Sequence, residues 1–372
     1  NGFGPVIRTD LLEENGIATP STWDEVLDAL AQLKEIYPDS TPWAIRKGTA
    51  NLLKTTSYML GSGFGSVSAS SGMYWDEDLG KYVYGPADTN FKEVLKFLNK
   101  AYTTGVLDQE YATTDSDSMT TKCSSGQSFF FVDNSGFGQN YTNELRKIDG
   151  NENATFQVLP IPENSLGERR AVSYDTRFGK LYAINANAKN KDQIIKFIDW
   201  MYSMEASDIT NYGIEGEPFQ YNADGEAEYI SDYVMQFKDA SPSDYYACWT
   251  DIGAGKLDFS MYACNIKTQR EIQMITGSWS DLTEDYWKII NEDDAYVQPH
   301  IAPSFTTEEA DRVKELTTDL DTFFTQEYDK YITGKESIDN WDALIKKAED
   351  MGVRELEQLW NDAEARAVAE TK

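Results

Sequence analysis

Residues 173–203 constrain the fold more than any other stretch, because their hydrophobic period changes from that of a strand to that of a helix. Side chains alternate between two faces over residues 180–185, as in an extended strand. After a polar turn, Ile194, Ile198 and Met201 fall on one stripe of a helix, with Phe197 beside them. This order of strand, short turn and amphipathic helix predicts a unit of an α/β protein.

The same alternation of element types runs through the rest of the chain. Thr22 stands three residues before Glu25, which is a capping box that opens a helix. Further helices are predicted over residues 90–102, 306–332 and 353–367, strands over 42–46, 129–132 and 156–160, and hairpins over 74–84 and 218–229. The chain is therefore predicted to be α/β.

Charge and cysteine content exclude several classes of function. The 372 residues carry a formal net charge of -30, which repels nucleic acid phosphates and anionic lipids, so neither is expected as a partner. Cys123, Cys248 and Cys264 are too few and too scattered for a disulfide framework or a zinc site, although Cys248 and Cys264 could pair. His300 is the only histidine, so a histidine-rich metal site or a catalytic triad is not expected.

Two acidic stretches and one glycine-rich stretch invite cofactor hypotheses that their spacing does not support. The Asp76–Asp78 and Asp115–Asp117 clusters lack the glycine and the distant glutamate of a calcium-binding EF-hand loop. The Gly/Ser stretch at 61–72 does not end in the Gly-Lys-Ser/Thr of a phosphate-binding loop. We expect no cofactor and no metal.

Four short motifs together resemble one protein family. They are Thr19-Pro20-Ser21-Thr22-Trp23-Asp24-Glu25, Gly105-Val106-Leu107-Asp108, Asn211-Tyr212-Gly213-Ile214-Glu215-Gly216, and the Tyr331-Ile332-Thr333-Gly334-Lys335 ending followed by Trp341. The chain resembles the family 1 extracellular solute-binding proteins of carbohydrate ABC transporters, the maltose-binding-protein class. The third motif resembles a lipoprotein and oligouronate-type subgroup.

The resemblance implies a two-lobed, periplasmic-binding-protein-like fold of type II, in which crossing hinge strands join the lobes. Mapped on this sequence, residues 1–6 end the first lobe and form the first crossing strand, and 7–178 form the second lobe. Residues 179–297 return to the first lobe, and the helices of 298–372 pack mainly on the second. The family has first-lobe residues before this point, so the resemblance implies that the first lobe is incomplete here.

The resemblance also implies a function. The chain is expected to capture an oligosaccharide by hinge closure and to deliver it to ABC permease subunits, without being an enzyme. It is expected at the outer face of the cytoplasmic membrane or secreted, touching the membrane only through a lipid anchor absent from this chain. Two alternatives stay open: a glycoside hydrolase, because carboxylates are plentiful, and a sugar-sensing or adhesion module.

Candidate ligand-binding residues lie at predicted strand ends and among the aromatic residues. Arg46 ends the predicted 42–46 strand, and Lys47 and Asn51 follow it. Asp133, Asn134 and Phe137 follow the buried 129–132 strand, at the end where α/β sheets bind ligands. Asp175, Arg177 and Phe178 precede the predicted crossing strand, and Trp249 and Trp279 are stacking candidates. Each also has a structural interpretation: Asp and Asn build turns, Arg and Lys are solvated, and tryptophans pack in cores.

Overall fold

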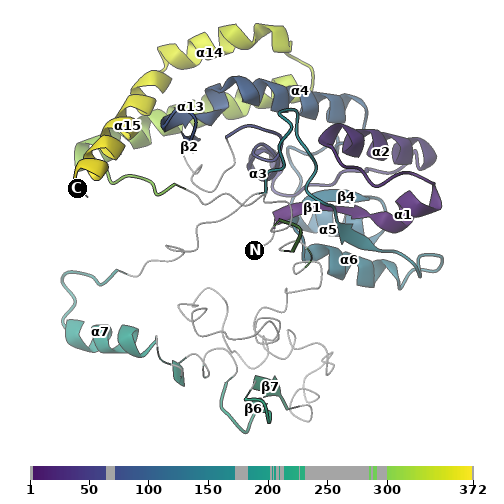
Figure 1. Ribbon diagram of the computed structural model, residues 1–372, viewed down its shortest axis with the longest axis horizontal. Coiled ribbons are helices and arrows are strands. Elements are labelled where there is room, and N and C mark those ends of the chain that lie inside the picture. Colours follow the sequence, from purple (N-terminus) through teal and green to yellow (C-terminus); the bar gives the residue numbers. More distant parts are fainter. Residues whose placement is uncertain are drawn as a thin grey trace. The chain divides into compact units, whose positions relative to one another are not determined.

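The computed structural model divides the chain into two compact units, residues 1–175 with 282–372 and residues 176–281 (Figure 1). It describes residues 3–63, 72–171, 183–201, 203, 205, 206, 209, 213–225, 227–230, 285, 288–290 and 300–370. The first unit holds most of the described secondary structure. How these units correspond to the lobes predicted from the sequence stays a prediction.

The sheet of the first unit has β1 (Phe3–Arg8) at its centre, antiparallel to both β4 (Phe130–Asn134) and β5 (Phe156–Val158). Its side chains alternate between two hydrophobic clusters. Val6 and Phe131 belong to one cluster, and Ile7 and Phe130 belong to the other. Both faces of the sheet are therefore covered, which explains why β1 and β4 are almost wholly buried.

Helices cover each face of this sheet (Figure 1). Buried residues of α2 (Trp23–Ile36) and α4 (Thr89–Thr103) join Ile7 in the larger cluster, and those of α5 (Ser116–Ser124) and α6 (Phe137–Leu145) join Val6 in the smaller one. The predicted capping box at the start of α2 is present, with the Thr22 side chain accepting from Glu25 N and the Glu25 side chain accepting from Thr22 N. The short α1 (Thr9–Glu14) joins β1 to α2.

The predicted strand at 42–46 is not a strand of the sheet. Only Trp43 forms bridges, to Leu107 and Phe130. Trp43 N donates to Val106 O and Asp108 N donates to Trp43 O, while Ala44 N donates to Phe130 O. The pairing ends there because the chain turns at Lys47, which has a left-handed φ of 60°, and enters α3 (Gly48–Thr56).

The C-terminal helices extend the larger cluster. They are α13 (Thr307–Ile332), η5 (Ile338–Asn340), α14 (Trp341–Asp350) and α15 (Val353–Glu370). The hairpin of β2 (Met73–Asp76) and β3 (Lys81–Tyr84), followed by η2 (Gly85–Ala87), packs against α15. There, Tyr82 N donates to Asn361 Oδ1 and Tyr84 N donates to Glu357 Oε1, at 2.8 and 3.0 Å. Side chains of α15 thus accept hydrogen bonds from backbone N–H groups along the open edge of this hairpin.

The second unit is described in part. It contains α7 (Lys191–Trp200) and a hairpin of β6 (Phe219–Tyr221) and β7 (Ala227–Tyr229), as predicted from the sequence. On the predicted α7 stripe, Met201 is buried and Ile194 and Ile198 are half-buried, whereas Phe197 is 57% exposed. The described end of the predicted 180–185 strand, residues 183–185, is not in a strand; residues 180–182 lie outside the described residues.

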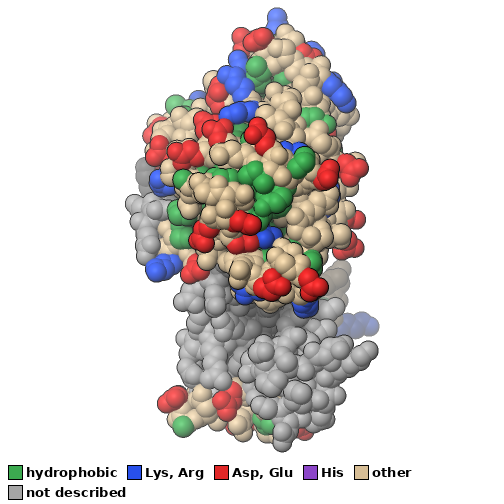
Figure 2. Space-filling view, turned by 90° about the vertical axis from the view of Figure 1, so that its right-hand side faces the viewer, with side chains coloured by type: hydrophobic (Ala, Val, Ile, Leu, Met, Phe, Trp, Pro, Cys, Tyr) green, Lys and Arg blue, Asp and Glu red, His purple; other side chains and the backbone are tan. Residues whose placement is uncertain are grey.

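Charged side chains cover much of the described surface. One face of the molecule shows acidic side chains interspersed with basic ones around a hydrophobic area (Figure 2).

No helix in the described ranges is long and apolar enough to cross a membrane.

Candidate functional site

Five of the eleven residues selected from the sequence meet in one place, where β4 ends and α3 and α6 begin. They are Arg46, Asn51, Asp133, Asn134 and Phe137, and they come from two segments more than eighty positions apart. The pairing at the centre is bidentate: Arg46 Nε donates to Asp133 Oδ2 at 2.8 Å, and Arg46 Nη2 donates to Asp133 Oδ1 at 2.7 Å. We call these five residues the Arg46 cluster.

Asp133 is the structural centre of the Arg46 cluster. Its side chain is 2% exposed, against 16% for Arg46. It also accepts from Asn51 Nδ2 at 3.4 Å and from the Asn134 backbone N–H at 2.7 Å. A buried carboxylate with four such bonds has its acceptor positions occupied, so Asp133 orients Arg46 and Asn51. A direct contact between Asp133 and a ligand stays a prediction.

Phe137 gives the Arg46 cluster an aromatic face. The Arg46 Cζ atom lies 5.0 Å from the centroid of its ring, within the range of a cation–π contact. Phe137 is half-buried and is the first residue of α6. The guanidinium is therefore held by a carboxylate and by a ring, which fixes its plane and leaves little conformational entropy to lose on binding.

The Asn134 side chain forms a turn that leads into α6, which fits its structural interpretation. Its Oδ1 accepts from Gly136 N at 3.1 Å, which is the side-chain-to-backbone turn that asparagine forms ahead of a helix. Ser135 is fully buried, and its Oγ has no hydrogen-bond partner among the described residues. Asn134 therefore shapes the turn that presents Phe137.

Lys47 lies beside the Arg46 cluster in a strained conformation. It is the one non-glycine residue with positive φ in the described part of the chain, and its side chain is exposed. Gly48 follows with a φ of +70°, and a Cβ there would lie 2.7 Å from Ala112 O. A left-handed lysine costs about 1 kcal/mol or more, and strain of this kind gathers at functional sites. The turn points an ammonium group into solvent next to the Arg46 cluster.

Tyr141 is a residue of this region that sequence reasoning missed. Its ring packs on those of Phe137 and Phe131, with centroids 6.2 and 5.6 Å away, and burial raises its pKa above the ordinary value for tyrosine. The Tyr141 hydroxyl therefore stays neutral across the physiological range. The i, i+4 spacing of Phe137 and Tyr141 was the signal that could have found it.

The other selected residues cannot be placed. Asp175, Arg177, Phe178, Trp249 and Trp279 lie outside the described residues, as do Cys248 and Cys264. Within the described ranges, no group of three or more His, Cys, Asp or Glu side chains is placed to hold a metal ion. What the structure assembles is a rigid guanidinium with an amide and an aromatic face nearby, a combination suited to hydroxyl and carboxylate recognition rather than to acid–base chemistry.

Comparison with known proteins gives consistent matches. The family model for bacterial extracellular solute-binding proteins matches residues 4–208. The polygalacturonan/rhamnogalacturonan-binding protein YtcQ of Bacillus subtilis (strain 168) is 22% identical, covering 97% of this chain and 67% of its own. The fructooligosaccharide ABC transporter substrate-binding protein FusA of Streptococcus pneumoniae serotype 4 (strain ATCC BAA-334 / TIGR4) is also 22% identical, with coverages of 93% and 62%. The chain thus spans about two thirds of the length of these relatives.

Solved structures show the same likeness at the level of the fold. A crystal structure of the alginate-binding protein AlgQ2 superposes with a TM-score of 0.73 at 20% sequence identity, covering 97% of this chain and 71% of that one.

Proposed function

The chain belongs to the bacterial extracellular solute-binding protein family, and on that premise we propose that it captures an oligosaccharide for an ABC importer. Family and fold likeness confirm two predictions made from the sequence, the family itself and its two-lobed α/β fold. Members of this family are binding proteins. We extend this to the chain itself: it binds its ligand and leaves it chemically unchanged.

The Arg46 cluster is the observation that carries the proposal. A sugar presents hydroxyl groups around its ring and apolar C–H groups on its faces. Arg46 and Asn51 can donate to hydroxyl oxygens, and the Phe137 ring can cover a C–H face. Since Asp133 holds Arg46 before any ligand arrives, the cluster is preformed, which favours affinity.

Relatives bind carbohydrates of several chemistries, as their names state: a polygalacturonan, a fructooligosaccharide and, for the structural neighbour, alginate. We propose an oligosaccharide as the ligand class for this chain on the same grounds. Capture would proceed by hinge closure, in which the ligand binds the closed state more tightly than the open one and shifts the population toward it.

Location and partners follow from the same proposal. The family is extracellular. We place the protein at the outer face of the cytoplasmic membrane, lipid-anchored or secreted, and its macromolecular partners are permease subunits of the importer. The net charge of -30 keeps copies of the chain apart in solution. This suits a protein that carries its captured ligand to the permease.

Isothermal titration against oligosaccharides of galacturonate, alginate and fructan tests the proposal. We expect at least one series to bind, and Arg46→Ala to weaken it about tenfold or more, the loss that corresponds to removing one good polar contact. Arg312→Ala is the control for loss of an arginine elsewhere, since Arg312 also forms a bidentate pair, with Glu355 between α13 and α15, although that pair is more exposed than Arg46–Asp133. The thermal transition of each variant is recorded alongside.

Two outcomes would contradict the proposal. The first is no binding by the folded protein to any of the three series. The second is release of reducing sugar from any of them, which would identify the glycoside hydrolase alternative.

A further inference from the structure

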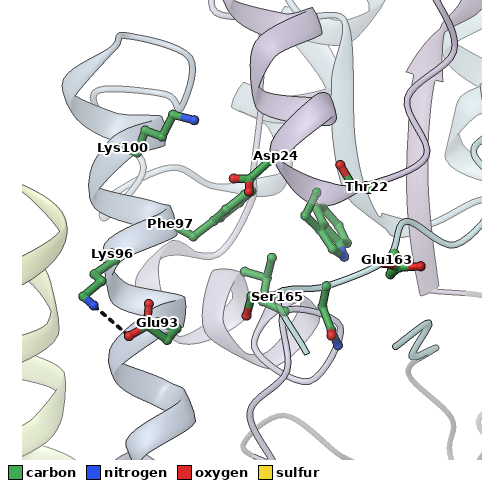
Figure 3. Close-up of a pocket in the computed structure, with 11 residues that line it drawn as sticks. Thr22, Asp24, Glu93, Lys96, Phe97, Lys100, Glu163 and Ser165 are labelled. Carbon is green, nitrogen blue, oxygen red and sulfur yellow. Dashed lines mark hydrogen bonds and ion pairs between the residues drawn. The ribbon is translucent and has the colours of Figure 1, made fainter. Parts of the chain in front are cut away.

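A concavity lies in the first unit, lined by residues that do not belong to the Arg46 cluster. It has a volume of about 350 Å³ and is bounded by the N-terminal end of α2, the middle of α4 and residues 163–165 (Figure 3). Its apolar part consists of Trp23, Leu60 and Phe97, with the Trp23 and Phe97 rings edge to face at 6.0 Å. Phe97 is half-buried and keeps part of its ring accessible.

The walls of this pocket are rigid. Trp23 N donates to Glu163 O at 3.0 Å, and Glu163 N donates to Ser21 O at 2.9 Å, so residues 163–165 are fastened to the start of α2. Asn164, 6% exposed, accepts from the backbone N–H groups of Leu166 and Glu168. A pocket held by backbone bonds exists before a ligand arrives.

The rim carries donors and acceptors in nearly equal number. Lys96 and Lys100 project from α4 (Figure 3). Asp24 belongs to α2, and Glu163 belongs to the segment 163–165. Lys96 Nζ is 2.7 Å from Glu93 Oε1, and Lys100 Nζ is 3.6 Å from Asp28 Oδ1. Both are exposed ion pairs, which are weak and exchange readily with other partners.

The mixture of lysines and carboxylates around the pocket selects against charged ligands. An anion that approached the lysines would meet Asp24, Glu93 and Glu163, and a cation that approached these carboxylates would meet Lys96 and Lys100. A hydroxyl group both donates and accepts, so it can bond to either kind of side chain without introducing a charge. The Phe97 ring adds an apolar face for the C–H groups of a ring.

We propose that this pocket is a peripheral binding site for a single neutral sugar ring. Its volume is at the lower end of the range for ligand sites, which suits one ring rather than an oligosaccharide. The site stands on its own residues and does not depend on the oligosaccharide-binding function proposed for the Arg46 cluster. It would hold a terminal or branching neutral residue of a glycan between α2 and α4.

Saturation-transfer NMR on the whole chain tests this site with three probes of equal size: methyl α-D-glucoside, D-glucuronate and D-glucosamine. Ser165→Trp fills the pocket from an exposed position, and Thr121→Trp places the same ring on an exposed position of α5 that does not line the pocket. We expect the neutral glycoside to bind best. Its affinity should fall about tenfold or more in Ser165→Trp and stay unchanged in Thr121→Trp.

Arg46→Ala separates this proposal from the previous one, since it should leave glucoside binding intact while it weakens oligosaccharide binding. Two outcomes with the wild type would refute the peripheral site: no binding of the glucoside, or tighter binding of either charged sugar. Two outcomes with variants would also refute it: Ser165→Trp binding the glucoside as tightly as the wild type, or Arg46→Ala losing glucoside binding. Oligosaccharide affinity unchanged in Arg46→Ala would instead count against the role of the Arg46 cluster.

Discussion

Asp133→Asn should destabilise the first unit substantially, because it removes the charge that pairs with Arg46. In the native protein Asp133 accepts two bonds from the guanidinium, one from Asn51 and one from its neighbouring backbone N–H. An asparagine keeps one oxygen and turns an NH₂ group toward the donors of Arg46. The substitution therefore loses one charge-assisted hydrogen bond and places the asparagine NH₂ against an N–H donor of Arg46. It also removes the carboxylate charge that pairs with Arg46.

The magnitude follows from the burial of the pair. Breaking a fully buried ion pair costs roughly 3–5 kcal/mol. Asp133 is 2% exposed but Arg46 is 16% exposed, so water can partly solvate the guanidinium once the Asp133 charge is gone. We therefore expect a loss of about 2–3 kcal/mol, below the fully buried range. Urea unfolding followed by tryptophan fluorescence measures it, since Trp43 is fully buried and bridges Phe130, the first residue of β4.

Glu355→Gln is the control for this experiment. It breaks a bidentate pair with Arg312 of the same geometry, at 2.6 and 2.7 Å, but both side chains are more than 40% exposed. Exposed pairs contribute little, so Glu355→Gln should leave the transition almost where it is. If Asp133→Asn proved no more destabilising than Glu355→Gln, the assignment of Asp133 as the structural centre of the Arg46 cluster would be wrong.

Three further predictions test other parts of the structure. Hydrogen bonds from Arg366 lower the pKa of Glu309 to about 2. Glu309→Gln should therefore be less stable than the wild type above the unfolded pKa of about 4.3. Urea unfolding should show that difference shrink as the pH falls below about 4.3 and disappear only as the pH passes below the folded pKa of about 2. Gly48→Ala should lose about 2 kcal/mol or more, because alanine must adopt a left-handed φ with its Cβ 2.7 Å from Ala112 O; an unchanged thermal transition would contradict this. Cys123 is fully buried and burial raises its pKa, so with the other two cysteines replaced by serine the native protein should not react with a thiol reagent until it unfolds.

Residues far apart in the chain build the Arg46 cluster, and each was a candidate for a separate reason. Arg46 ends a stretch that was predicted to be a strand and pairs only at Trp43. Asp133 was predicted to follow a buried strand over 129–132, and it lies within β4, which runs to Asn134. The local sequence around Arg46 and around Asp133 does not specify that these two side chains form an ion pair. That pairing fixes the Arg46 guanidinium against a buried carboxylate.

The sequence by itself determined the elements whose cause is local. The capping box at Thr22, the helices predicted over 90–102 and 306–332, and the hairpins around residues 78 and 223 all depend on side chains a few positions apart, so periodicity and capping reveal them. Only the tertiary structure decided which face of β1 meets which helices, that residues 42–46 bridge at one position instead of forming a strand, and that Arg46 meets Asp133. Those outcomes depend on contacts between distant segments, whose free energy arises only once the chain has closed on itself.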